Sequence, residues 1–196
     1  MLLLVASILV LFLLNLFLGS VHIPMDSIWN ILWGLDGDES VIWQNIIWKS
    51  RIPQSLTALV AGAGLAVSGL QMQTVFRNPL AGPSVLGISS GASLGVAFVV
   101  LLSGSIGGIA LSRLGFMGEI ALTVAAIVGA LSVMALIVYV SQKVHGNVTL
   151  LIIGVMIGYV ANAVIGVLKF FSVEEDIRAY VIWGLGSFAR VSGNQV

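Results

Sequence analysis

Five long apolar stretches constrain this chain more than any other feature of its sequence. They cover residues about 2–18, 55–75, 85–102, 120–140 and 149–171, and Lys169 is the one charged residue within them. A helix needs about 20 mostly apolar residues to cross the hydrocarbon core of a bilayer. The sequence therefore predicts an all-α polytopic membrane protein, with five transmembrane helices in a single membrane-embedded domain over residues 1–196.

Composition supports this class and excludes several others. Only 8% of the 196 residues are charged, whereas a soluble domain carries about 25%. The formal net charge is zero and no basic run is present, so nothing indicates a nucleic-acid partner. The chain has no cysteine, which excludes disulfides, a thiolate nucleophile and a cysteine-based metal site.

Two segments do not fit the spanning pattern. Residues about 20–50 contain acidic residues and four tryptophans, and we expect an interfacial segment lying against the membrane. Within it, Asp26 or Ser27 is predicted to cap a short helix that ends at Trp33, with a turn over 34–37. A sixth element, residues 177–188, is too short to cross. It is either an interfacial helix or the lead into a sixth span.

Small residues recur every four positions in three of the predicted spans. The positions are Gly87, Gly91 and Gly95, then Ala121, Ala125 and Gly129, then Gly154, Gly158, Asn162 and Gly166. Such ridges let helix backbones approach closely. We therefore expect them to be packing surfaces.

The chemistry that the chain lacks limits its function. His22 and His145 both fall between spans, so an intramembrane hydrolase has no base at membrane depth, and no cluster of metal ligands is present. There is no P-loop sequence, and no Asp or Glu occupies the middle of a span. We predict no cofactor and no catalytic residue. A transporter of this kind needs a separate ATPase subunit, or else it conducts passively.

The most unusual local sequence joins the second and third predicted spans. Arg77, Asn78 and Pro79 are followed closely by Gly82 and Pro83. The Asn-Pro and Gly-Pro pairs should end one helix and form a tight connection into the next.

The same region carries a family resemblance. Arg51-Ile-Pro, Ala61-Gly-Ala-Gly-Leu-Ala-Val-Ser-Gly, Gln71-Met-Gln, Phe76-Arg-Asn-Pro-Leu-Ala and Pro83-Ser-Val-Leu-Gly-Ile-Ser-Ser-Gly-Ala match the pattern, with weaker matches at Leu151-Ile-Ile-Gly-Val and Trp183-Gly-Leu-Gly-Ser-Phe. The chain closely resembles the FecCD-type permeases of ABC importers, which take up ferric siderophores, haem and cobalamin. The family often has a second arginine where this chain has Gln54.

The resemblance implies a fold and a set of partners. Family members have about ten spans and work as homodimers in the bacterial inner membrane, with cytoplasmic ATPase subunits and an extracytoplasmic binding protein. Residues 1–196 are then expected to be the first half of such a permease, without the later loop that engages the ATPase. The implied function is import of a chelated metal or cobalamin-type cargo, with a cytoplasmic amino terminus and with residues 20–51 facing the binding protein.

Several residues are candidates for function under this resemblance. Arg51 and Arg178 are predicted to dock carboxylates of the binding protein. The alternative for Arg51 is an interfacial anchor, and for Arg178 it is local pairing with Glu174, Glu175 or Asp176. Tyr159, Asn162, Gln71 and Gln73 are candidates either for the cargo pathway or for hydrogen bonds between helices. The alternative functions are a passive channel or scaffold and an intramembrane enzyme.

Overall fold

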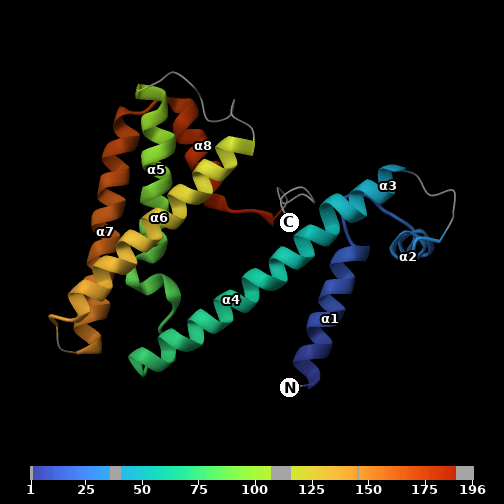
Figure 1. Ribbon diagram of the computed structural model, residues 1–196, viewed down its shortest axis with the longest axis horizontal. Helices are drawn as coiled ribbons and strands as arrows, with labels where there is room; N and C mark the ends of the chain where they lie inside the picture. Colours follow the sequence, from blue (N-terminus) through green and yellow to red (C-terminus); the bar gives the residue numbers. More distant parts are fainter. Residues whose placement is uncertain (1, 36–40, 107–115, 145, 189–196) are drawn as a thin grey trace. The chain divides into compact units, whose positions relative to one another are not determined.

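The computed structural model describes residues 2–35, 41–106, 116–144 and 146–188. All regular structure in these ranges is helical, which confirms the all-α prediction (Figure 1). The α-helices are α1 (Leu2–Phe17), α2 (Met25–Trp33), α3 (Val41–Ile46), α4 (Ile52–Phe76), α5 (Ile88–Ile106), α6 (Phe116–Ser141), α7 (Asn147–Phe171) and α8 (Glu174–Leu185). A π-helical turn, Ile47–Arg51, joins α3 to α4, and a 3₁₀ turn, Pro83–Leu86, precedes α5.

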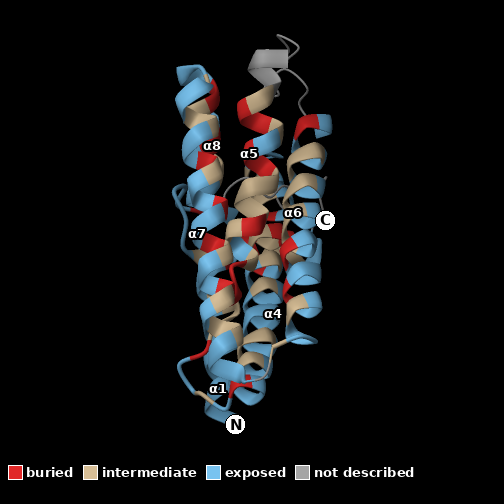
Figure 2. Cartoon of the chain, turned by 90° about the vertical axis from the view of Figure 1, so that its left-hand side faces the viewer, coloured by how far each residue is buried: buried red, intermediate tan, exposed pale blue. Residues whose placement is uncertain are grey.

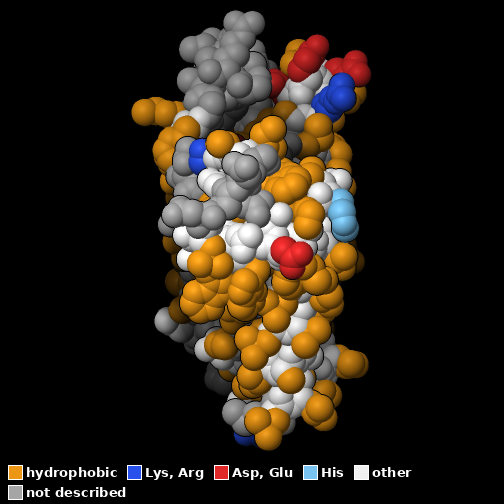
Figure 3. All heavy atoms as spheres, turned by 90° about the vertical axis from the view of Figure 1, so that its right-hand side faces the viewer, with side chains coloured by type: hydrophobic (Ala, Val, Ile, Leu, Met, Phe, Trp, Pro, Cys, Tyr) orange, Lys and Arg blue, Asp and Glu red, His pale blue; other side chains and the backbone are white. Residues whose placement is uncertain are grey.

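Helices lie at all five places where a span is predicted, but they differ in length. Three helical stretches of the described chain are long and apolar enough to cross a bilayer: Val41–Phe76, Phe116–Ser141 and Asn147–Phe171. The apolar stretches Leu2–Phe17 and Ile88–Leu102 are shorter. Apolar side chains dominate the molecular face shown in Figure 3, as a lipid-facing protein requires.

The chain divides into two units, residues 1–64 with 187–196 and residues 65–186. In the first unit, α2 packs on a cluster of isoleucines that the π-helical turn and the neighbouring loop share. The buried members are Ile23, Ile28, Ile31 and Ile47. Phe17 at the end of α1 and Ile52 at the start of α4 pack against this cluster, so the ends of both helices are held beside α2.

The second unit is a bundle in which α5 packs against α6, α7 and α8. Figure 2 shows buried residues on the inward sides of α5 and α7, with exposed residues outside. One core joins α5 to α7 and α8 through Val96, Ala97, Leu101, Ile165 and Tyr180. A second core lies at the other end of α7 and includes Phe76, Leu86 and Ile137. The Asn147 amide donates a hydrogen bond to the Val75 carbonyl (2.8 Å), which ties the start of α7 to the end of α4.

The small-residue ridges of α5 and α6 pack as predicted, and the ridge of α7 packs in its first half, at Gly154 and Gly158. A Cβ atom on Gly95 would lie 2.1 Å from the Ala125 carbonyl oxygen, and one on Gly129 would lie 2.2 Å from the Gly91 carbonyl oxygen. A Cβ on Gly154 would meet the Leu86 backbone at 2.8 Å. Because only glycine leaves room for these backbones, the ridges fix where α5 crosses α6 and meets α7. Gly166 is different, because no atom lies within 4 Å of its Cβ position.

The connection between α4 and α5 also agrees with its prediction. The helix ends at Phe76, and Arg77 adopts a left-handed conformation with φ 48°. The Asn78 side chain accepts a hydrogen bond from the Leu80 amide (2.9 Å), as in an Asx turn. Gly87 has φ 75°, so a residue with a Cβ would be strained there, and α5 begins directly after it.

Two predicted boundaries are wrong. The α2 helix begins at Met25, after Pro24, and neither Asp26 nor Ser27 caps it. Proline lacks an amide hydrogen, so Pro24 at the N-cap removes one of the unpaired donors of the helix start, and Ser27 is buried inside. The helical stretch that contains α4 begins at Val41 rather than near Ser55. The π-helical turn comes just before Pro53, and the helix continues past this proline. The predicted end at Trp33 is correct, with Gly34 in the left-handed conformation.

Candidate functional site

Arg51 lies in a different environment from the one that a docking charge needs. Its side chain is 5% exposed. The guanidinium donates hydrogen bonds to the carbonyl oxygens of Leu16 (2.5 Å), Phe17 (3.3 Å) and Val21 (2.5 Å). Gly19 leaves the space that the guanidinium fills, since a Cβ there would lie 2.7 Å from Nη2. Arg51 thus caps the carboxyl-terminal end of α1, where helix carbonyls lack partners.

A second polar contact lies one helical turn further along α4. The Ser55 hydroxyl is 2.7 Å from Asn15 Oδ1 and 2.8 Å from the Arg51 carbonyl oxygen. Together with the Arg51 guanidinium, this contact fastens the end of α1 to the start of α4. The sequence analysis did not identify it, although Asn15 is one of two polar residues in the first apolar stretch and that isolation was the available signal.

Arg178 is exposed on α8, as a docking residue requires. It makes no ion pair with residues that the structure describes, and Glu174 and Glu175 in the first turn of α8 are exposed as well. Asp176 is 8% exposed, and its Oδ2 atom has no hydrogen-bond partner in the described part of the chain. The local pairing that was the alternative for Arg178 is therefore not observed among these residues.

Tyr159 and Asn162 lie near each other on α7, three residues apart, and both are exposed. The packed side of α7 is buried through Gly154, Gly158 and Ala161, and Asn162, four residues after Gly158, lies at the edge of that side. A tyrosine and an asparagine on the outward face of an apolar helix need either water or a partner outside this bundle. Gln71 and Gln73 on α4 are exposed too. The structure brings Tyr159 and Asn162 together but does not join them to the two glutamines.

The residues of the α4–α5 connection occupy the turn described above. Arg77 and Pro79 are exposed, whereas Asn78 and Pro83 are half-buried. His22 is exposed, and His145 lies outside the described residues. Among the described residues, no three His, Cys, Asp or Glu side chains gather as metal ligands.

One interaction within the bundle also escaped the sequence analysis. The Lys169 ammonium lies 4.8 Å from the centre of the Tyr180 ring, and the Tyr180 hydroxyl is hydrogen-bonded to Ser93. A cation over an aromatic face is attracted by its negative quadrupole. The contact explains how the charge at the end of α7 is accommodated beside α8.

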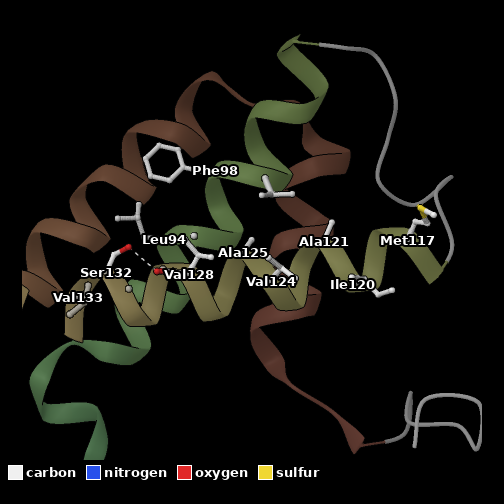
Figure 4. A pocket seen from close by; sticks show the side chains of 14 residues that line it. Leu94, Phe98, Met117, Ile120, Ala121, Val124, Ala125, Val128, Ser132 and Val133 are labelled. Atoms are coloured by element: carbon white, nitrogen blue, oxygen red, sulfur yellow. Dashed lines mark hydrogen bonds between the residues drawn. The ribbon is translucent and has the colours of Figure 1, made fainter. Parts of the chain in front are cut away.

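A cavity of about 660 Å³ lies between α5 and α6, where the glycine ridges cross (Figure 4). Its walls are apolar, with Leu94, Phe98, Val124 and Val128 among them. The Ser132 hydroxyl donates its hydrogen bond to the Val128 carbonyl (2.8 Å) and so offers no free donor. The cavity carries no charge and no nucleophile. Its apolar lining fits a hydrocarbon chain or an apolar helix better than a polar substrate.

Comparisons with known proteins agree with this picture of an apolar helical bundle. The model of the FecCD transport family matches residues 7–196. The hemin transport system permease HmuU of Yersinia pestis is 36% identical over 186 residues, covering 93% of this chain and 52% of the relative. The vitamin B12 import permease BtuC of Pectobacterium atrosepticum is 33% identical, covering 84% of this chain and 45% of the relative.

A solved structure supports the same relationship. An inward-facing metal-chelate type ABC transporter superposes with a TM-score of 0.73 and 26% sequence identity. The match covers 95% of this chain and 53% of that one. The chain thus spans about half the length of the relatives it matches, and these relatives are transporter permeases, not enzymes. Because the family model covers nearly all of the sequence, this chain belongs to the FecCD transport family.

Proposed function

We propose that this chain forms part of the permease subunit of a binding-protein-dependent ABC importer in a bacterial inner membrane. The observation that carries the proposal is the family match over residues 7–196, together with relatives that import hemin and vitamin B12. We propose five spans for this part, formed by α1, by α5 and by the three longer helical stretches. The cargo is proposed to be an iron–siderophore, haem or a cobalamin-type chelate.

The energy source follows from what the helices contain. Glu119 stands in the first turn of α6 and Lys169 in the last turn of α7, so neither charge is near the middle of its helix. A carboxylate at membrane depth is the usual means of coupling to protons or cations. The sequence also has no P-loop. We therefore assign ATP hydrolysis to a separate cytoplasmic subunit, and we propose a second permease copy that completes the pathway.

Tyr159 and Asn162 are proposed to line the cargo pathway. They are exposed in the middle of α7, among exposed apolar side chains that include Val155 and Val160. A polar pair on such a face is stable where water or a second subunit meets it, and costly in hydrocarbon. Gln71 and Gln73 are proposed to serve the same pathway from α4.

For the binding protein, we propose that Arg178 docks directly and that Arg51 acts indirectly. An exposed rim charge steers association and fixes register, which Arg178 can do from the surface of α8. Arg51 is buried, and its guanidinium donates hydrogen bonds to three backbone carbonyl groups. Its proposed contribution is to hold the end of α1, from which the extracytoplasmic segment starts.

ATPase stimulation tests this assignment against a passive channel or scaffold. The protein, expressed from its own reading frame, is reconstituted in liposomes with its ATPase subunit, and ATP hydrolysis is measured with and without loaded binding protein. Stimulation by the loaded binding protein is the expected result. Solute flux that needs neither partner would establish the passive channel instead.

A further inference from the structure

The short helix α2 presents three different surfaces around its circumference. One faces the isoleucine cluster through Ser27, Ile28 and Ile31, all of which are buried. A second is an exposed apolar stripe in which each residue follows the last by four positions. This Trp stripe consists of Met25 (69% exposed), Trp29 (55%) and Trp33 (67%). The third is polar and contains Asp26 and Asn30.

Exposure of the Trp stripe to water would be unfavourable. Three large apolar side chains in a row expose a continuous patch, whereas a soluble amphipathic helix exposes polar residues opposite its buried face. The rings of Trp29 and Trp33 lie 5.8 Å apart between centroids, so they form one surface. A helix with one protein-facing side, one apolar side and one polar side fits the boundary between a helix bundle, lipid and water.

The neighbours of α2 fix its depth at such a boundary. Phe17, the last residue of α1, and Ile52, the first of α4, pack on the same cluster as α2. Both helices are apolar, and the side chains of Leu9 and Leu13 on α1 are exposed as in a lipid-facing surface. Helix α2 therefore lies beside the ends of two apolar helices. At that level tryptophan is the preferred residue, because its ring is apolar and its N–H can reach water.

We propose that the Trp stripe binds the headgroup zone of the phospholipid bilayer, so that α2 lies in the plane of the membrane surface. This inference goes beyond the transport function and does not depend on it. The attraction is apolar, because α2 carries no Lys or Arg and Asp26 is its one charged side chain. Neutral lipid is therefore sufficient, and added salt does not release the helix.

Tryptophan quenching by brominated lipids tests the proposal on the full chain. The five tryptophans are Trp29, Trp33, Trp43, Trp48 and Trp183. The double variant Trp29→Phe/Trp33→Phe is reconstituted in vesicles of phosphatidylcholine brominated near the headgroup end of the acyl chain. It is expected to lose a large part of the lipid-quenchable emission of the parent chain, with the exposed Trp48 as the main remaining source. The control Trp43→Phe, which removes a half-buried ring packed on the isoleucine cluster, is expected to keep it.

A second variant gives the location directly. A chain that retains Trp29 alone, with the other four replaced by phenylalanine, should be quenched more by lipid brominated near the headgroup than by lipid brominated near the methyl end. The quenching should be equal with and without anionic lipid and at low and high salt. Quenching of Trp29 by iodide from water without lipid quenching would overturn the proposal. So would protection from both quenchers, which would show that protein covers the stripe.

Discussion

The guanidinium of Arg51 donates a hydrogen bond to the carbonyl oxygen of Leu16, the penultimate residue of α1. This contact joins α1 to the π-helical turn that precedes α4, 35 residues further along the sequence. It places a positive charge at the end of a helix where unpaired carbonyls carry partial negative charge. A residue that resembles a surface docking charge in sequence is thus part of the internal structure.

Arg51→Met is expected to lower the free energy of unfolding by about 2 kcal/mol, because three carbonyls lose a charged donor in a buried site. Arg51→Lys should recover only part of this, since an ammonium cannot reproduce the fork of the guanidinium. Lys49→Met is the control, because Lys49 is exposed in the same π-helical turn. Unfolding in mixed micelles titrated with a denaturing detergent gives all three values. Equal effects at positions 49 and 51 would refute the capping role.

Gly95→Ala is expected to destabilise the bundle by about 1–3 kcal/mol, because the new Cβ would lie 2.1 Å from the Ala125 carbonyl oxygen and force α5 away from α6. Gly166→Ala makes the same chemical change in α7 where nothing lies within 4 Å. That control should be neutral or stabilising by up to about 1 kcal/mol, as alanine favours the helix. The same unfolding titration compares them. A tolerated Gly95→Ala would contradict the close crossing of α5 and α6.

Cysteine accessibility tests the proposed pathway face, and the parent chain has no cysteine to remove. Tyr159→Cys and Asn162→Cys should react with a water-soluble maleimide in the assembled importer, because thiolate forms only where water reaches the sulfur. Val160→Cys is the control, because Val160 is exposed on the same helix about 100° around the axis from Tyr159, and we expect it to face lipid and to react slowly. Labelling is followed by mass shift. Reaction at position 160 but not at 159 and 162 would reverse the assignment.

Arg178→Glu is expected to slow association of the binding protein several-fold at low salt and to leave dissociation nearly unchanged, as a rim charge does. Arg178→Gln should have about half that effect on a logarithmic scale, since it removes the charge without inverting it. Stopped-flow association at several salt concentrations measures both. Association of the Arg178→Glu variant that matches the parent at every salt concentration would exclude Arg178 from the docking surface.

Periodicity and hydropathy predict much of this fold because they reflect forces that act locally. The end of α4 at Phe76 follows from Asn78-Pro79, and the crossings of α5 with α6 follow from glycine spacing. The beginning of α4 was not predictable in the same way. The predicted span began near Ser55, whereas a π-helical turn just before Pro53, with Ile47 packed in the isoleucine cluster, connects α4 to a helix that begins at Val41.

The candidate site was less predictable than the fold. The sequence indicated Arg51 as a docking residue and did not indicate its hydrogen-bond partners, because backbone carbonyls 30–35 residues away leave no signature of their own. Tyr159 and Asn162 were identified because polar residues stand out in an apolar helix. That both are exposed could be seen only in three dimensions, because the packing of α7 buries Gly158 and leaves Asn162, one turn later, exposed. Neither the sequence nor the structure indicates which cargo is carried, since the described part of the chain holds no metal-ligating cluster.

ATP-dependent accumulation of cargo tests the central claim most directly. Liposomes that contain the assembled importer, with ATP inside or outside, are supplied with binding protein loaded with hemin, cobalamin or a ferric chelate in parallel. The proposed function predicts that one cargo accumulates in the lumen against its gradient, only when hydrolysable ATP reaches the ATPase subunits. Equilibration of cargo at the same rate with and without ATP would contradict the claim and identify a passive channel.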